Sequence, residues 1–337
     1  MNVYEPLVTL KRGELTECVF YGHISAVGQE TFFSAGDWEH AAFYRSASKP
    51  IQAMPVVYLG LKDKYGITEE ELALMCGSQR CEMYHIPFIE SLMEKAQVRD
   101  EDLIMLPAFP LHQETRDEMI RMGMKKKKIY HNCIGKHIAC ILIQRELGGE
   151  EKDYYKPDSA AQRHILSLIA DMAGTYEEEV KVGVDGCGVP VFGVKGKEIA
   201  RSFLKLAAND MILNPEIREA AGTCCQAIHK APRLFSAKGH FDTVIHEDEN
   251  IICKGGALGV QCFALRDERL GFFIKLSDGS YDVLPLLVLH LLEEISYKNK
   301  ETIKLLKERY PFAVKNDCDA VVADYHITLK LKDYEVT

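Results

Sequence analysis

Apolar positions follow two different periods along this chain. In the first 45 residues, β-branched and aromatic residues alternate with polar ones, which is the pattern of half-buried strands. It predicts strands at residues 15–27, 31–34 and 40–44. From residue 50 onward, the apolar residues recur at helical spacing, so the segment that follows is expected to be rich in helices.

Capping residues mark the ends of several predicted helices. Thr68 is followed three residues later by Glu71, which forms a capping box. Gly148 and Gly174 end two further helices, because glycine readily adopts the left-handed conformation found there. The predicted helices comprise residues 50–58, 68–75, 86–93, 137–147, 159–173, 198–208, 215–231 and 283–295.

Short strands return among and after the later helices. They are predicted at residues 180–184, 243–245, 251–254, 260–266 and 271–276. Strands, then many helices, then strands and a helix favour an α+β fold, with an antiparallel sheet beside a helical lobe. No repeat or linker divides the sequence, so residues 1–337 are expected to form one compact unit, with two interleaved lobes as an alternative. Active sites often lie between such lobes.

The composition is that of a globular protein with a small-molecule partner. Its 337 residues are 47% hydrophobic and 27% charged. The 41 basic and 50 acidic residues give a net charge of −9, which disfavours binding to nucleic acid or to an anionic membrane. The lysines at 125–128 have no aromatic residues between them and are expected to lie in a solvated loop.

The N-terminal sequence and the cysteines indicate the cell compartment. The first 30 residues lack the zones of a signal peptide, and no apolar run approaches the length of about 20 residues that a membrane span needs. We therefore expect a cytoplasmic protein with no membrane partner. The eleven cysteines are then expected to be reduced thiols, either buried or bound to a metal.

Ser46 and Lys49 are the first candidates for chemistry. Their spacing places both side chains on one face of a helical turn, where a neutral lysine can accept the serine proton. A strand pattern ends and a helix begins here, so the serine oxygen is expected to reach a cleft. The alternative is structural, because Ser46 or Ser48 could instead cap the helix.

Cys133 and Cys187 are candidate metal ligands. One lies at a predicted helix start and the other follows a predicted strand, each beside glycine. Two thiolates with a nitrogen from Lys136 or His137 could hold zinc, although a lysine must lose its proton before it can coordinate. The alternative is a pair of buried cysteines next to glycine turns.

Lys254 ends a predicted strand and is followed by Gly255 and Gly256. The two glycines would let a substrate lie close to the backbone, while the lysine contributes a charge. Together with the Ser-x-x-Lys motif, this is a partial match to the Lys-Thr-Gly strand of penicillin-recognising enzymes, since glycine stands in place of threonine.

Five motifs in this order resemble the L-asparaginase II family of the Rhizobium etli type. The resemblance covers roughly residues 5–290, and residues 273–280 are also similar to the family's terminal Lys-x-x-Asp-Gly-Ser sequence. The motifs are Arg45-Ser46-Ala47-Ser48-Lys49-Pro50-Ile51-Gln52, Cys76-Gly77-Ser78, Asn132-Cys133-Ile134-Gly135-Lys136-His137, Asp185-Gly186-Cys187-Gly188-Val189-Pro190 and Lys254-Gly255-Gly256.

The resemblance implies a fold like that of serine β-lactamases and penicillin-binding proteins, a homodimer, and hydrolysis of L-asparagine to L-aspartate and ammonia. The catalytic residues that it implies are Ser46 with Lys49 as its base, Ser78 and Lys254. The substrate-binding residues that it implies are Arg45, His137, Asp185 and Glu82. The zinc ligands that it implies are Cys133, Lys136 and Cys187.

Elementary electrostatics agrees with these implied roles. Asparagine is a zwitterion, so its carboxylate needs a cation such as Arg45 and its ammonium needs an anion such as Asp185. If Lys49 and Lys254 lie close together, their mutual repulsion lowers the pKa of at least one of them, which would leave a neutral amine to act as a base.

Three positions depart from the family pattern. Gln79-Arg80-Cys81 precede Glu82 where the family usually has a run such as His-Ser-Gly, Ile134 replaces a serine, and Leu258 stands where glutamate is common. Changed polar groups alter substrate choice more than fold. Two alternatives to an asparaginase therefore remain: a serine hydrolase acting on another amide or a β-lactam, and a non-catalytic zinc- or amino-acid-binding homologue.

Overall fold

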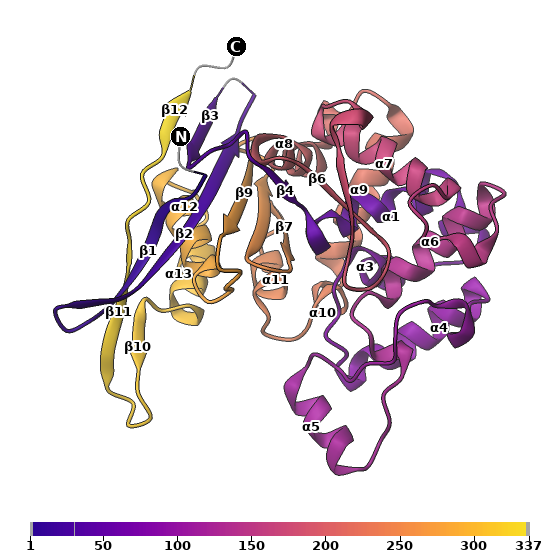
Figure 1. The fold of residues 1–337 in the computed structure, drawn as a ribbon, viewed down its shortest axis with the longest axis horizontal. Helices are drawn as coiled ribbons and strands as arrows, with labels where there is room; N and C mark the ends of the chain where they lie inside the picture. Colours follow the sequence, from indigo (N-terminus) through magenta and orange to yellow (C-terminus); the bar gives the residue numbers. More distant parts are fainter. Residues whose placement is uncertain (1–2, 30, 335–337) are drawn as a thin grey trace.

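A large antiparallel sheet lies on one side of the molecule and a group of helices on the other (Figure 1). The computed structural model describes residues 3–29 and 31–334. The main path of the sheet runs in the order β10-β11-β1-β2-β9-β8-β7, with β3 paired to β2 and β12 paired to β3. Its strands are β1 Glu5–Arg12, β2 Leu15–Val27, β3 Phe32–Ala35, β7 Ile251–Gly256, β8 Val260–Leu265, β9 Leu270–Leu276, β10 Ala313–Lys315, β11 Val321–Ile327 and β12 Lys332–Tyr334.

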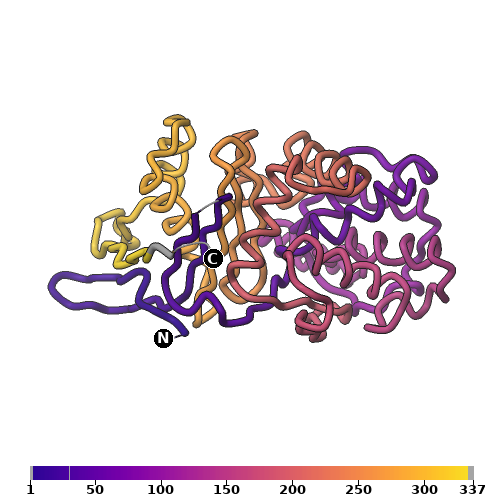
Figure 2. Tube along the Cα trace, turned by 90° about the horizontal axis from the view of Figure 1, so that it is seen from above, coloured from indigo at the N-terminus to yellow at the C-terminus, as the bar shows by residue number. Residues whose placement is uncertain are grey.

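The two ends of the chain meet in this sheet. Strand β11 pairs with β1, and Val8 lies opposite Ile327. Figure 2 shows the yellow C-terminal segment beside the indigo N-terminal strands, with the magenta helices at the far end of the molecule. At the other side of the sheet, β7 is the end strand, and its neighbour beyond that edge is the helical lobe.

A second, smaller sheet has the order β4-β6-β5. Its strands are β4 Ala41–Phe43, β5 Lys181–Val184 and β6 Pro190–Lys195. The turn between β5 and β6 is closed by hydrogen bonds from the Asp185 amide to the Val189 carbonyl and from the Gly188 amide to the Asp185 carbonyl. Because β4 leads directly into Tyr44, this sheet brings the turn at 185–189 beside the segment that contains Ser46.

The helices form the lobe and cover both faces of the large sheet. Apolar residues of α8 join the core on one face, together with Cys262 and Phe273, whereas α12 packs on the other face against Phe263 and Ile274. The helices are α1 Lys49–Tyr58, α2 Leu61–Lys64, α3 Glu69–Cys76, α4 Ile86–Ala96, α5 Gln113–Arg121, α6 Ile134–Glu146, α7 Ala160–Ala173, α8 Gly196–Ala207, α9 Pro215–Lys230, α10 Pro232–Phe235, α11 Phe241–Val244, α12 Leu284–Glu294 and α13 Lys300–Arg309.

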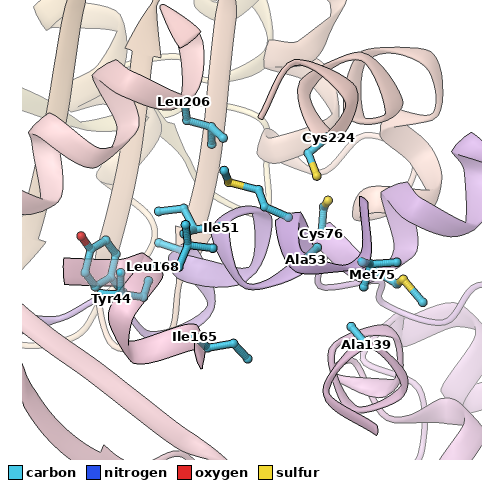
Figure 3. Close-up of a cluster of buried hydrophobic side chains, with 14 of the residues drawn as sticks. Tyr44, Ile51, Ala53, Met75, Cys76, Ala139, Ile165, Leu168, Leu206 and Cys224 are labelled. Carbon is cyan, nitrogen blue, oxygen red and sulfur yellow. The ribbon is translucent and has the colours of Figure 1, made fainter. Parts of the chain in front are cut away.

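Small and sulfur-containing side chains let the lobe helices approach one another closely. Cys76 of α3 lies toward Cys224 of α9, and Met75 lies near Ala139 of α6 (Figure 3). All four residues are buried. All eleven cysteines of the sequence are free thiols in the described part of the chain, as expected, and nine of them are buried.

The α+β architecture expected from the sequence is confirmed, and most predicted elements are present. The strand predicted at 243–245 is wrong, because this segment forms the end of α11 and a following 3₁₀ turn. Its three β-branched or apolar residues suggested a strand, but the His240 side chain caps a helix there by accepting a hydrogen bond from the Asp242 amide. In the described residues, no helix combines the length and the apolar character that crossing a membrane requires.

Candidate active site

A cavity of about 780 Å³ lies at the edge of β7, where the sheet meets the helical lobe. Ser46, Ser78 and Lys254 line it, although they come from three distant parts of the sequence. Gly256 of β7 makes this meeting possible, because a Cβ on it would lie 2.6 Å from the Tyr44 carbonyl oxygen. The sheet edge therefore packs directly against the backbone that leads into Ser46.

Lys49 connects the two serine-bearing segments. Its side chain is fully buried at the start of α1, and its Nζ donates hydrogen bonds to Ser78 Oγ at 2.9 Å and to the Asn132 carbonyl at 3.1 Å. Burial lowers the pKa of Lys49, and the positive charges of Lys136 and Lys254 lower it further, while Cys133 opposes them. A larger fraction of Lys49 is thus in the neutral amine form, which can accept a proton, than is usual for a lysine.

Ser46 lies in a 3₁₀ turn, Arg45–Ser48, that continues into α1. Its side chain is half-buried at the cavity wall, and its hydroxyl has no hydrogen-bond partner among the residues that the structure describes. The capping alternative is not found: Ser48 occupies the cap position without a cap bond, and its hydroxyl donates to the Arg45 carbonyl at 3.0 Å. Arg45 has φ 51°, a left-handed conformation that is uncommon away from glycine and often found at functional sites.

Lys254 is held by a carboxylate that the sequence did not reveal. Its buried Nζ lies 2.8 Å from Asp242 Oδ2 and donates to the Gly255 carbonyl. Burial alone would raise the pKa of Asp242, but Lys254, His240 and hydrogen bonds hold it well below its usual value. The expected repulsion between Lys254 and Lys49 is present, yet burial is the larger cause of the lowered pKa of Lys49.

Arg45 and Asp185 pair with each other rather than facing the cavity. The Arg45 guanidinium donates to Asp185 Oδ1 at 2.8 and 3.1 Å, and Asp185 Oδ2 lies 3.3 Å from Lys136 Nζ. Burial would raise the pKa of Asp185, but the positive charge of Lys136 and the hydrogen bonds from Arg45 lower it. Neither residue lines the cavity, so their contact with substrate stays a prediction.

The three predicted zinc ligands come together in one buried cluster. Lys136 Nζ lies 3.1 Å from Cys187 Sγ, and the thiols of Cys133 and Cys187 donate to Asn132 Oδ1 at 3.9 Å and to Asp185 Oδ2 at 3.8 Å. The neighbouring cysteine lowers the pKa of Cys133 and raises that of Cys187. Burial would lower the pKa of Lys136, but the two sulfurs and Asp185 raise it.

This donor set is unusual for a metal site. Within residues 3–29 and 31–334, no three His, Cys, Asp or Glu side chains form a group that could hold a metal ion. The predicted cluster supplies only two such residues, both cysteines, and its third donor is Lys136. Two adjacent sulfurs, one favouring the thiolate, and one amine suit a thiophilic ion such as zinc, provided that the amine loses its proton.

His137 and Glu82 lie away from the cavity lining. His137 is buried, with Nδ1 2.7 Å from the Tyr154 hydroxyl, and burial lowers its pKa to about 3. Glu82 accepts hydrogen bonds from Arg233 at 2.9 and 3.1 Å and from the Lys238 amide at 3.0 Å. These bonds occupy its carboxylate, and its predicted contact with substrate stays a prediction.

Several other polar residues line the cavity. In the sequence, Arg80 stood out only as a departure from the family pattern and Asn132 only as part of a motif, whereas nothing pointed to His240 and Asp242. His240 caps α11 and Asp242 lies in its first turn, just before residues 243–245 that were predicted as a strand, and no local spacing links them to Lys254. They reach the cavity that Ser46 and Ser78 line only in the folded protein, where Asp242 pairs with Lys254 of β7.

Comparison with known families identifies the class of the protein as an amidohydrolase. More particularly, the chain belongs to the L-asparaginase II family, whose model matches residues 8–327. The family resemblance seen in the sequence motifs is therefore confirmed. No curated protein gives a significant sequence match.

The chain is also similar to solved structures of low sequence identity. They include Mglu in its glutamate form, with 13% identity, 82% of this chain and 60% of that chain covered, and a TM-score of 0.43. A class C β-lactamase from Rhodobacter sphaeroides has 13% identity, coverage of 80% and 95%, and a TM-score of 0.42. A Bacillus glutaminase has 13% identity, coverage of 82% and 91%, and a TM-score of 0.37. The chain thus spans 60% of the length of Mglu.

Proposed function

We propose that this amidohydrolase converts L-asparagine to L-aspartate and ammonia through Ser-Lys catalysis. One observation carries the proposal: the buried Lys49 amine lies 2.9 Å from Ser78 Oγ at a cavity that Ser46 also lines. A lysine whose pKa is lowered by burial can act as a base, and an adjacent hydroxyl can relay the proton.

In the proposed first step, Ser46 Oγ attacks the side-chain amide carbon of asparagine. The serine proton passes through the Ser78 hydroxyl to Lys49 Nζ, which a neutral amine can accept. The carbon–nitrogen bond then breaks, and the proton held by Lys49 returns to the leaving nitrogen, so that ammonia departs and an ester on Ser46 remains.

In the proposed second step, water replaces the serine. Lys49, neutral again, accepts a proton from the attacking water, the ester bond breaks, and Ser46 recovers its proton as L-aspartate leaves. Lys254 Nζ lies at the cavity wall, 2.8 Å from Asp242 Oδ2. Its proposed role is to orient the substrate and the Gly255–Gly256 backbone rather than to transfer protons.

We further propose that Cys133, Lys136 and Cys187 hold one zinc ion. The contact of Lys136 Nζ with Cys187 Sγ at 3.1 Å and the burial of all three side chains support this set. When bound, zinc would supply Lewis-acid charge next to the site. The family resemblance also leads us to propose a homodimer located in the cytoplasm.

The test of the proposed function is ammonia release from L-asparagine by purified protein, measured beside Ser46→Ala and with zinc content determined on each sample. We expect Ser46→Ala to lose at least about 10³-fold in kcat while its zinc content and melting temperature stay unchanged. Ser46→Ala activity close to wild type would contradict the serine assignment. A wild-type protein that is loaded with zinc yet inert toward amides would favour the non-catalytic binding homologue.

A second candidate function follows from the size of the cavity. About 780 Å³ falls in the range that encloses drug-sized ligands and exceeds what a free amino acid fills. A serine hydrolase acting on a larger amide or a β-lactam is therefore a competing proposal. Covalent labelling of Ser46 by a penicillin, detected by mass spectrometry, without ammonia release from asparagine, would favour it.

A further inference from the structure

Arg80 is placed in the cavity by the backbone on both of its sides. Its amide donates to the Ser236 carbonyl at 3.0 Å, and its own carbonyl accepts a hydrogen bond from the His112 amide at 2.7 Å. These bonds fix the Cα position two residues after Ser78. The side chain is half-buried and lines the same cavity as both serines.

The Arg80 guanidinium has no hydrogen-bond or ion-pair partner within the described parts of the chain. This distinguishes it from Arg45 and Lys254, two other cations near the site; in the described residues Arg309 also has no such partner, but it is exposed. Arg45 is paired with Asp185, and Lys254 is paired with Asp242, each at 2.8 Å. A half-buried guanidinium without an anion is costly unless a ligand or water completes its hydrogen bonds.

The charges that line the cavity favour an anion over a cation. Of the lining carboxylates, Asp242 accepts hydrogen bonds from Lys254 and the Gly255 amide, and Asp282 is exposed. Arg309, which also lines the cavity, is exposed and adds a second guanidinium. The cavity thus carries a local positive charge in a protein whose net charge is −9, and this concentrates anionic ligands there.

We propose that Arg80 is the residue that binds the carboxylate of the substrate. The inference rests on the proposed amide hydrolysis at the same site and assigns to Arg80 the role that the sequence motifs suggested for Arg45. A guanidinium presents two parallel N–H donors that match the two oxygens of a carboxylate, so recognition depends on arginine geometry and not only on charge.

The test compares two ligands of nearly equal size, L-asparagine and L-asparaginamide, in which the carboxylate is replaced by an amide. Binding is measured by calorimetry at pH 6, where both ligands carry an ammonium group, on the Ser46→Ala protein and on the same protein with Arg80→Gln, Arg80→Lys or Arg121→Gln. Because the Ser46→Ala background does not turn over, this readout is independent of whether asparagine is hydrolysed.

We expect Arg80→Gln to weaken L-asparagine binding about 10-fold to 100-fold and to leave L-asparaginamide binding unchanged. Arg80→Lys should recover only part of the loss, and Arg121→Gln, the control at an exposed arginine of α5 that does not line the cavity, should change either affinity less than about threefold. An equal loss for both ligands in Arg80→Gln, or no preference of the Arg80-containing protein for L-asparagine over L-asparaginamide, overturns the proposal. If the wild type releases no ammonia but this binding pattern is found, the proposed function is rejected and the role of Arg80 in carboxylate binding stands.

Discussion

Lys49 shows at the scale of one residue how burial changes the pKa of a side chain. It lies at the first position of α1, where it is enclosed by Asn132 and Ser78, and burial lowers its pKa. The same lysine on a surface would stay protonated and could not act as a base. Two predictions concern this side chain.

The first prediction is that Lys49→Met abolishes catalysis without unfolding the protein. Methionine has a similar volume and no amine, so kcat for ammonia release should fall about 10²-fold to 10⁴-fold. The melting temperature should be unchanged or higher, because a buried amine is removed. Paired measurements of kcat and thermal unfolding check this, and a variant with more than a tenth of wild-type activity would contradict the role of Lys49 as base.

The second prediction concerns the pH dependence of the wild type. The proposed base acts in its neutral form, so kcat/KM should rise with pH as Lys49 loses its proton and then level off. Because the pKa of Lys49 is lowered, the plateau should begin below about pH 10.4, the usual value for lysine. A profile that falls steadily from pH 5 to pH 9 would exclude a lysine base.

The third prediction concerns the buried pair of Asp242 and Lys254. Asp242→Asn leaves an unpaired buried ammonium and should reduce the free energy of unfolding by about 3–5 kcal/mol at pH 7. The folded-state pKa of Asp242 is below its unfolded value, so its contribution is present above about pH 4 and is lost as the pH falls through the folded pKa.

Urea unfolding of wild type and Asp242→Asn between pH 2 and pH 7 measures this contribution. The difference between the two proteins should be constant from about pH 5 to pH 7 and shrink at lower pH. A difference that grows with acidity would have the wrong sign for a carboxylate with a lowered pKa.

At the scale of elements, the active site depends on how closely α3 approaches α6. Gly135, at the second position of α6, would place a Cβ 2.4 Å from the Leu74 carbonyl oxygen of α3. The two helices therefore touch through backbone atoms, and this contact positions Asn132 and Cys133, which precede α6, against Lys49.

The fourth prediction is that Gly135→Ala destabilises the protein by about 1–3 kcal/mol, even though alanine favours a helix more than glycine does. Gly186→Ala is the control, because no atom lies within 4 Å of its added Cβ. Chemical denaturation of both variants checks the difference. Equal stability of the two would show that α3 and α6 can separate at little cost.

Elements with a clear period could be predicted from the sequence, and strands that pair across a long stretch of sequence could not. The capping box at Thr68 and the glycine after residue 173 indicated α3 and α7 because such signals are local. Strands β1 and β11 lie more than 300 residues apart and stabilise each other, so neither carries a complete signal of its own. Strand β6 was also not predicted, because it is only six residues long and its apolar residues do not alternate with polar ones. Helices α5 and α13 were not predicted because each has few buried apolar residues.

At the scale of the whole molecule, the cavity lies where the sheet, the lobe and the C-terminal segment meet. Ser78 comes from the lobe, Lys254 from the sheet, and Arg309 and Tyr325 from the C-terminal segment. A bond that fixes the lobe relative to the smaller sheet should therefore influence the site. The proposed zinc ion would form such bonds, because Cys133 and Lys136 lie at the start of α6 and Cys187 lies in the turn after β5.

The fifth prediction is that the purified protein contains about one zinc per chain and that a chelator lowers its melting temperature. At a free zinc concentration 100-fold above the dissociation constant, bound zinc adds about 2.7 kcal/mol to the free energy of unfolding. Cys133→Ala and Cys187→Ala should lose the metal and the chelator effect together. Retained zinc in both variants would show that the ion binds elsewhere.

Local signals in the sequence indicated the α+β class, the family motifs and the candidate site residues Ser46, Lys49, Lys254 and the cysteine pair, because reactive side chains near glycine and helix starts can be recognised without contacts. The family resemblance added Ser78 as a candidate. The tertiary structure alone decided which partners these residues have. It paired Lys49 with Ser78, Lys254 with Asp242 and Arg45 with Asp185, and it left Arg80 free in the cavity. These outcomes depend on the approach of segments that are 12 to 140 residues apart, and no local pattern carries that information.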